Sequence, residues 1–168
     1  QLIFIANDGN NGVELWRTDG TTDGTQIIKD IYTGPTSSNL GDFTVSNDLI
    51  FFTARDGNNG YELWKTDGTA PGTTMVIDIN NGSGSSAITE IEAMGGWVLF
   101  ALSTLSGECE LWKSDGTEEG TSLLFTPKKN GWCNYDPLYL TEVGDSVLLR
   151  ANDGITGLEL YRLGIESQ

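Results

Sequence analysis

The sequence predicts an all-β fold, a β-propeller built from four-stranded blades of about 48 residues each. The first observation behind this prediction is an internal repeat. The tripeptide Glu14–Trp16 returns as Glu62–Trp64 and Glu110–Trp112, 48 residues apart each time, and as Glu159–Tyr161 after 49. The second is that each repeat carries short β-branched and aromatic runs between glycine-rich turn signals, without sustained helical periodicity.

The second repeat shows the expected strands most clearly, at residues 50–54, 61–66, 74–79 and 88–94. Applied to the whole chain, the same pattern predicts three, four, four and three strands, fourteen in all. We therefore expect a single domain over residues 1–168, with about 3.5–4 blades and with units at approximately 1–41, 42–87, 88–137 and 138–168.

The chain begins at the strand before the first Glu-Leu-Trp and ends just after its last counterpart. A ring of blades could close within one chain, by pairing of chains, or with residues outside this sequence, and the sequence does not decide among these. An open stack would expose strand edges, which folded proteins avoid. The start at Gln1, without an initiator Met or a signal-peptide pattern, is typical of a processed or excised chain.

The turns between strands account for many of the acidic residues and glycines. We expect Asp19, Asp67 and Asp115 to accept hydrogen bonds from backbone N–H groups of their own turns. We expect a positive φ at glycines that follow an aspartate in the first turn of a repeat, namely Gly9, Gly57 and Gly154. The repeated Trp predicts a buried ring at the same place in each unit, with its N–H paired.

Residues 14–21, 62–69 and 110–117 all read Glu-Leu-Trp, a basic residue, Thr or Ser, then Asp-Gly-Thr. These segments resemble the ELWxxDGT repeat family, and the resemblance covers nearly the whole chain. It implies tandem propeller-type repeats in secreted or surface-displayed proteins. The family has no established set of catalytic residues that could be assigned to positions of this sequence. The third unit departs most from the pattern, with residues 104–108 in place of Asp-Gly-Asn-Asn-Gly and Thr126-Pro127 in place of Asp-Ile.

Composition excludes several functional classes. The formal net charge is -15, with nine Lys and Arg against 24 Asp and Glu, so phosphate-binding surfaces for nucleic acid are not expected. Histidine is absent, which removes His-based catalysis and His-ligated metals. No apolar run approaches the roughly 18–20 residues of a membrane span. We expect a protein that is not an enzyme.

Two cysteines occur, Cys109 and Cys133, both in the third unit. They predict a disulfide that ties a loop to a strand, against the alternative of two independent thiols. A disulfide would favour a secreted, extracellular or cell-surface location.

The segment from Pro127 to Pro137 is the least repeated part of the chain. Its Lys128, Trp132 and Tyr135 combine a cation with aromatic rings that could stack on sugar faces or on a partner surface. The alternative is an insertion that packs its own Trp over a sheet edge.

A Ca²⁺ site is a further candidate, although no cofactor is required. Side-chain oxygens at short spacing occur in the first turn of three repeats: Asp8 and Asn10, Asp56 and Asn58, and Asp153. Each turn supplies too few ligands alone, and Asx turns explain the same residues without a metal. Separately, Asn81 begins an Asn-Gly-Ser glycosylation acceptor on a Gly/Ser loop.

Together these observations predict a non-catalytic extracellular recognition module that binds a glycan or a repetitive surface ligand, as lectins do, through propeller loops. The alternative is a structural or assembly module that mediates protein–protein contacts in an extracellular coat, matrix or filament, with calcium as a candidate stabilising ion. A homo-oligomer is compatible with both.

Overall fold

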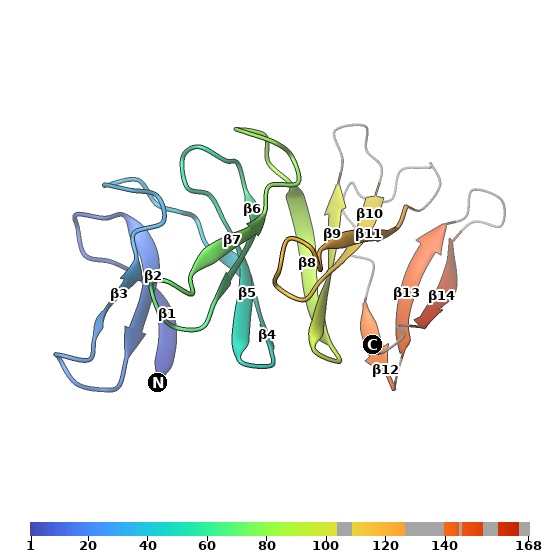
Figure 1. Cartoon of the computed structure of the whole chain (residues 1–168), viewed down its shortest axis with the longest axis horizontal. Helices are drawn as coiled ribbons and strands as arrows, with labels where there is room; N and C mark the ends of the chain where they lie inside the picture. The colour runs from blue at the N-terminus through green and yellow to red at the C-terminus, as the bar shows by residue number, and fades with distance from the viewer. Residues whose placement is uncertain (104–108, 127–139, 145, 153–157, 165–168) are drawn as a thin grey trace. The chain divides into compact units, whose positions relative to one another are not determined.

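The computed structural model describes residues 1–103, 109–126, 140–144, 146–152 and 158–164. These residues form fourteen strands in four separate antiparallel sheets (Figure 1), which confirms the all-β prediction. The sheets contain three, four, four and three strands in chain order, as the turn signals predict. Among the described residues no helix could cross a membrane.

The strands of the first two sheets are β1 (Leu2–Asn7), β2 (Val13–Thr18) and β3 (Gln26–Lys29), then β4 (Gly41–Ser46), β5 (Leu49–Ala54), β6 (Glu62–Thr66) and β7 (Thr74–Ile77). Those of the last two sheets are β8 (Ala87–Met94), β9 (Trp97–Ser103), β10 (Cys109–Ser114) and β11 (Ser122–Phe125), then β12 (Thr141–Val143), β13 (Ser146–Asn152) and β14 (Leu158–Gly164). Within each sheet, neighbours in the chain are neighbours in the ladder.

The prediction of a propeller is wrong, because the described strands form no closed or propeller-like sheet. Among the described strands, β1 ends the first sheet and β14 ends the last, and each of the four sheets is a separate ladder. The physical reason is that strand and turn signals are local and repeat faithfully, whereas closure requires pairing between the two ends of the chain. The repeat therefore specifies each sheet without specifying a ring.

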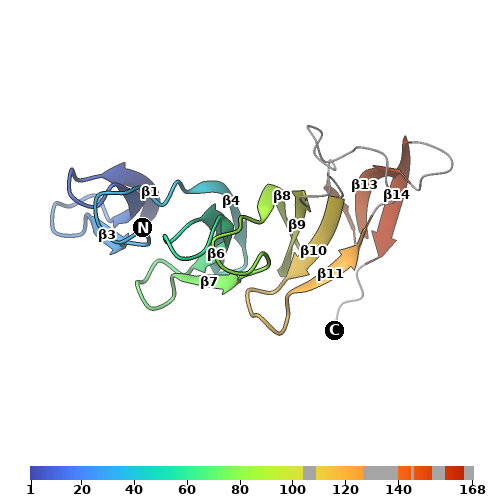
Figure 2. The same cartoon turned by 90° about the horizontal axis from the view of Figure 1, so that it is seen from above.

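The chain divides into two compact units, Gln1–Ser86 and Ala87–Gln168. In the first unit Leu15, Phe52, Ala54 and Trp64 form a buried core with Ile28 and Ile31. In the second, Figure 2 shows β8 to β11 as one sheet. The core of that unit joins residues of this sheet to residues of β13, and its buried members are Met94, Leu99, Ala101, Leu111, Leu140, Val147 and Leu149.

The Glu-Leu-Trp motif lies at the same irregularity in three sheets. The ladder shifts register between Leu15 and Trp16, and again between the equivalent residues of β6 and β10. A shift of this kind bends a strand and redirects its side chains. Trp64 is buried, whereas Trp16 is half-buried, and the indole N–H of each lies buried without a hydrogen-bond partner. The expectation of a paired N–H is confirmed at Trp112 alone, which donates to Glu110 at 2.9 Å.

The Asp-Gly-Thr turns have the expected Asx geometry. Asp67 Oδ1 accepts the amide of Thr69 at 2.8 Å and its hydroxyl at 2.7 Å, and the turns at Asp19 and Asp115 have the same pair of bonds. The glycine five residues after the aspartate makes room for the carboxylate, because a Cβ on Gly72 would lie 2.1 Å from Asp67 Oδ1. The Asp-Gly-Thr-x-x-Gly-Thr spacing is therefore a single turn structure.

Candidate functional site

The loop predicted to bind a ligand through Lys128, Trp132 and Tyr135 lies outside the described residues, as does Cys133 of the predicted disulfide. Asp153 and Gly154 also lie outside them. Cys109 is buried in β10. The disulfide and the loop site therefore stay predictions.

The candidate calcium turns are built as Asx turns. Asp8 Oδ1 accepts the amides of Asn10 and Asn11 at 2.8 and 2.9 Å, and its Oδ2 accepts the Asn11 side chain. These bonds, the Asn11 amide first, hold the pKa of Asp8 below its ordinary 3.8. The following Gly9 has a φ of 86°, as expected.

The second of these turns repeats the first. Asp56 Oδ1 accepts the amides of Asn58 and Asn59 at 2.9 and 2.8 Å, and Gly57 has a φ of 93°. Across the described part of the chain, no group of three or more Asp, Glu or Cys side chains is placed to hold a metal ion. Calcium at these turns stays a prediction. The glycosylation acceptor Asn81 lies exposed in a turn.

The first residue of Glu-Leu-Trp is a buried carboxylate. Glu62 is fully buried and accepts the amide of Ile79 at 3.1 Å, the amide of Ser86 at 3.0 Å and the Ser86 hydroxyl at 2.6 Å. Burial raises the pKa of Glu62 above its ordinary 4.5, against the opposing effect of these donors. The carboxylate thus ties the start of β6 to the connection that leads out of the sheet after β7.

The first repeat has the same tie, 48 residues earlier. Glu14 accepts the amide of Ile31 at 3.0 Å, and both of its oxygens lie 2.5 Å from the Ser38 hydroxyl. Burial raises the pKa of Glu14 as well. Sequence reasoning missed this role, although the constant spacing of 24 between the Glu and the second Ser of each Ser-Ser pair was a usable signal.

An arginine lies between two tyrosines in the first unit. The Arg55 guanidinium lies 5.4 Å from the ring centroid of Tyr32 and 5.7 Å from that of Tyr61, within cation–π range. The Tyr61 hydroxyl accepts the side-chain amide of Asn39 at 2.7 Å. Because the guanidinium takes one face of each ring, this cluster joins the two repeats of the unit and is a poor platform for sugars.

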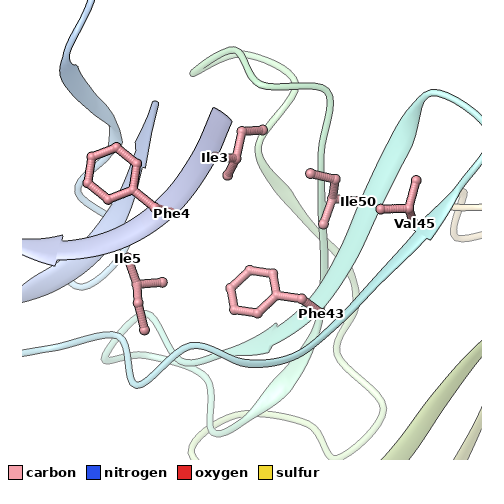
Figure 3. A pocket seen from close by; sticks show the side chains of 6 residues that line it. All are labelled: Ile3, Phe4, Ile5, Phe43, Val45 and Ile50. Carbon is pink, nitrogen blue, oxygen red and sulfur yellow. The ribbon is translucent and has the colours of Figure 1, made fainter. Parts of the chain in front are cut away.

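An apolar groove of about 470 Å³ lies in the first unit between β1 and the β4–β5 hairpin. Figure 3 shows residues of β1 on one side and residues of the hairpin on the other. Its lining consists of Ile3, Phe4, Ile5, Phe43, Val45 and Ile50. No side chain in this lining carries a charge or a hydrogen-bonding group, so the groove suits an apolar occupant and offers no acid–base chemistry.

The groove walls expose large apolar side chains to solvent. The exposed fractions are 47% for Ile5, 44% for Phe43 and 65% for Val45. At the position of the third repeat that corresponds to Phe43, Ile91 is only 6% exposed. The second repeat therefore exposes an apolar side chain at a position where the third repeat buries one.

No protein-family model matches the sequence, and a search of curated proteins found no match. The resemblance to ELWxxDGT repeats accordingly rests on the motifs alone.

Proposed function

We propose that this protein is a non-catalytic module for recognition and assembly, and that the groove between β1 and β4 binds a protein partner. The observation that carries this proposal is the contiguous exposed apolar lining of the groove in a chain of net charge -15. Exposed apolar patches in strongly charged proteins mark interaction surfaces, because leaving them in water is unfavourable. The apolar lining favours a protein partner over a glycan, which needs polar groups for its hydroxyls.

The proposal includes an extracellular location for the protein. It is supported by the pair Cys109 and Cys133 and by the resemblance to surface-displayed repeats. Glycan binding through Lys128, Trp132 and Tyr135 is the competing hypothesis, and it needs a different surface.

The test is a selection of displayed peptides on the wild-type protein, with counter-selection on Val45→Asp. Val45 is largely exposed, so the substitution alters the groove without unpacking the core. Val143→Asp is the matched control, because Val143 is also an exposed strand valine, at 50%, and does not line the groove.

We expect peptides that bind the wild type and Val143→Asp but not Val45→Asp. Enrichment that Val45→Asp leaves unchanged, or an oligosaccharide array that binds through Trp132 while no peptide is enriched, would overturn the proposal.

A further inference from the structure

The inference concerns the Asn-Gly dipeptides of the chain, and it is independent of the groove. In such a dipeptide the backbone nitrogen of the glycine can attack the side-chain amide carbon of the asparagine, because no Cβ shields that nitrogen. The described residues contain three of these dipeptides: Asn11-Gly12, Asn59-Gly60 and Asn81-Gly82. The structure places the three in different surroundings.

Two of the three asparagine side chains are held by the aspartate of their own turn. Asn11 Nδ2 donates to Asp8 Oδ2 at 2.8 Å, and Asn59 Nδ2 donates to Asp56 Oδ2 at 3.0 Å. Each side chain must break this charge-assisted bond before its amide carbon can turn toward the next nitrogen. Asn81 is exposed, and within the described part of the chain its side chain has no hydrogen-bond partner.

The space around the following glycine differs in the same sense. A Cβ on Gly12 would lie 2.6 Å from the Thr36 carbonyl carbon, and one on Gly60 would lie 2.1 Å from the Gly84 carbonyl oxygen. Both glycines are therefore packed against neighbouring backbone. A Cβ on Gly82 would meet nothing within 4 Å, so this peptide has room to change its geometry during an attack.

The Gly82 nitrogen also has a base beside it. Its N–H donates to Asp78 Oδ2 at 2.9 Å, which is within the reach of a general base for the proton it removes. The Gly60 N–H donates instead to the carbonyl oxygen of Gly82, at 3.2 Å. A peptide carbonyl is not a base at neutral pH, so this second arrangement does not assist loss of the proton.

We propose that Asn81 is a site of spontaneous modification through a cyclic imide, with Asp78 as the base. The Gly82 nitrogen forms a bond to Asn81 Cγ while its proton passes to Asp78. The bond between Cγ and Nδ2 then breaks, and the amide leaves as ammonia with the proton that Asp78 returns. Water opens the imide at either carbonyl, which leaves aspartate or isoaspartate at position 81.

Isoaspartate changes the local structure because it adds one carbon to the backbone before Gly82. Gly82 donates to Asp78 and accepts from Gly60, so it joins the connection after β7 to the turn before β6. A longer backbone displaces both bonds. Either product also adds a negative charge and removes the side-chain amide that N-glycosylation at Asn81 would require.

The test follows all three asparagines in one sample of the intact protein, produced without N-glycosylation and kept at neutral pH. Mass spectrometry of peptides from successive digests measures the conversion at each site. In the folded protein we expect Asn81 to react about tenfold faster than Asn11 and Asn59, because those two must first break a bond to a carboxylate. In urea-unfolded protein the three sites should react at similar rates, since each is an asparagine before a glycine.

A pair of variants tests the base. Asp78→Asn keeps an oxygen for the Gly82 N–H but removes the carboxylate, and it should slow conversion of Asn81 at least about tenfold. Asp30→Asn is the matched control, because Asp30 is the equivalent residue of the first repeat and accepts the Gly34 N–H at 3.1 Å. This control should leave the rate at Asn81 unchanged.

Hydrogen exchange tests the structural consequence. The Gly60 amide should exchange faster in the isoaspartate form than in the unmodified protein. Asn81→Asp is the control, because it adds the same charge without lengthening the backbone, and its Gly60 amide should exchange as in wild type.

Each measurement can overturn the part of the proposal that it addresses. If Asn81 reacts no faster than Asn11 and Asn59 in the folded protein, the site itself is wrong, and this comparison needs no variant. If Asp78→Asn slows the reaction no more than Asp30→Asn does, Asp78 is not the base. Equal exchange at Gly60 in the isoaspartate form and in Asn81→Asp would contradict the displacement of Gly82.

Discussion

Replacing Glu62 by Ala removes the carboxylate that joins the start of β6 to the connection after β7. The side chain is 0% exposed, and three donors converge on it from Ile79 and Ser86. The amide of Ser86 also donates to the Tyr61 carbonyl at 2.8 Å, so it keeps a partner in the variant. The Ile79 amide and the Ser86 hydroxyl lose theirs.

The magnitude follows from those two donors. A buried donor left without a partner costs about 1–3 kcal/mol, so the loss of two partners should lower the free energy of unfolding by about 2–6 kcal/mol. The desolvated charge disappears at the same time, which keeps the loss from exceeding this range. Against a typical stability of about 5–15 kcal/mol, such a loss is readily measured.

Urea unfolding followed by tryptophan fluorescence measures the effect, since Trp64 is buried in the core of the same unit. Asp23→Ala is the control, because Asp23 is an exposed carboxylate of that unit, and its removal should change stability by less than about 0.5 kcal/mol. A Glu62→Ala variant as stable as Asp23→Ala would refute the structural role. The double variant with Ser86→Ala should be less than additive, because the two residues share one bond.

Three further predictions can be checked on the same unit. Burial raises the folded-state pKa of Glu62 above its ordinary 4.5, so the native state holds this proton more tightly than the unfolded chain. As pH rises through the window above 4.5, wild type should therefore lose stability relative to Glu62→Gln in paired urea titrations, and a constant difference would contradict the assignment. Gly60→Ala should cost about 1–3 kcal/mol, because its Cβ would lie 2.1 Å from the Gly84 carbonyl oxygen. Thermal melts should show a larger loss than for Gly41→Ala, because Gly41 has no positive φ and its Cβ would meet only the Thr53 hydroxyl, at 3.3 Å. Arg55→Ala should cost about 1 kcal/mol through loss of its two tyrosine contacts, and an unchanged melting temperature would argue against them.

The sheets were predictable from sequence because their signals are local. The Asp-Gly-Thr spacing encodes a turn in which Asp67 accepts from Thr69 while Gly72 leaves room for the carboxylate. Alternating apolar runs encode the strands between such turns. Both kinds of signal repeat with the period, so the number of strands in each sheet follows from the sequence alone.

The candidate site was less predictable, because the exposure of its side chains depends on which strands pack beside β4. Phe43 and Ile91 occupy equivalent repeat positions and read alike in sequence, yet one is exposed and the other buried. The difference arises from neighbouring strands, which no local pattern reports. The prediction of propeller closure was wrong for the same reason, because no local sequence pattern reports whether strands far apart in the chain pair with each other.

The buried Glu of the motif connects the repeat to the groove. Glu14 holds Ser38, which lies three residues before β4 begins at Gly41, and it also holds the amide of Ile31 at the far side of the same connection. The tie therefore determines where the chain enters β4, and β4 forms one wall of the groove. A feature that the sequence displays as a structural repeat thus helps to position Phe43 and Val45 in the wall of the groove. Glu14 therefore contributes to the proposed binding surface by positioning β4, although it does not line the groove.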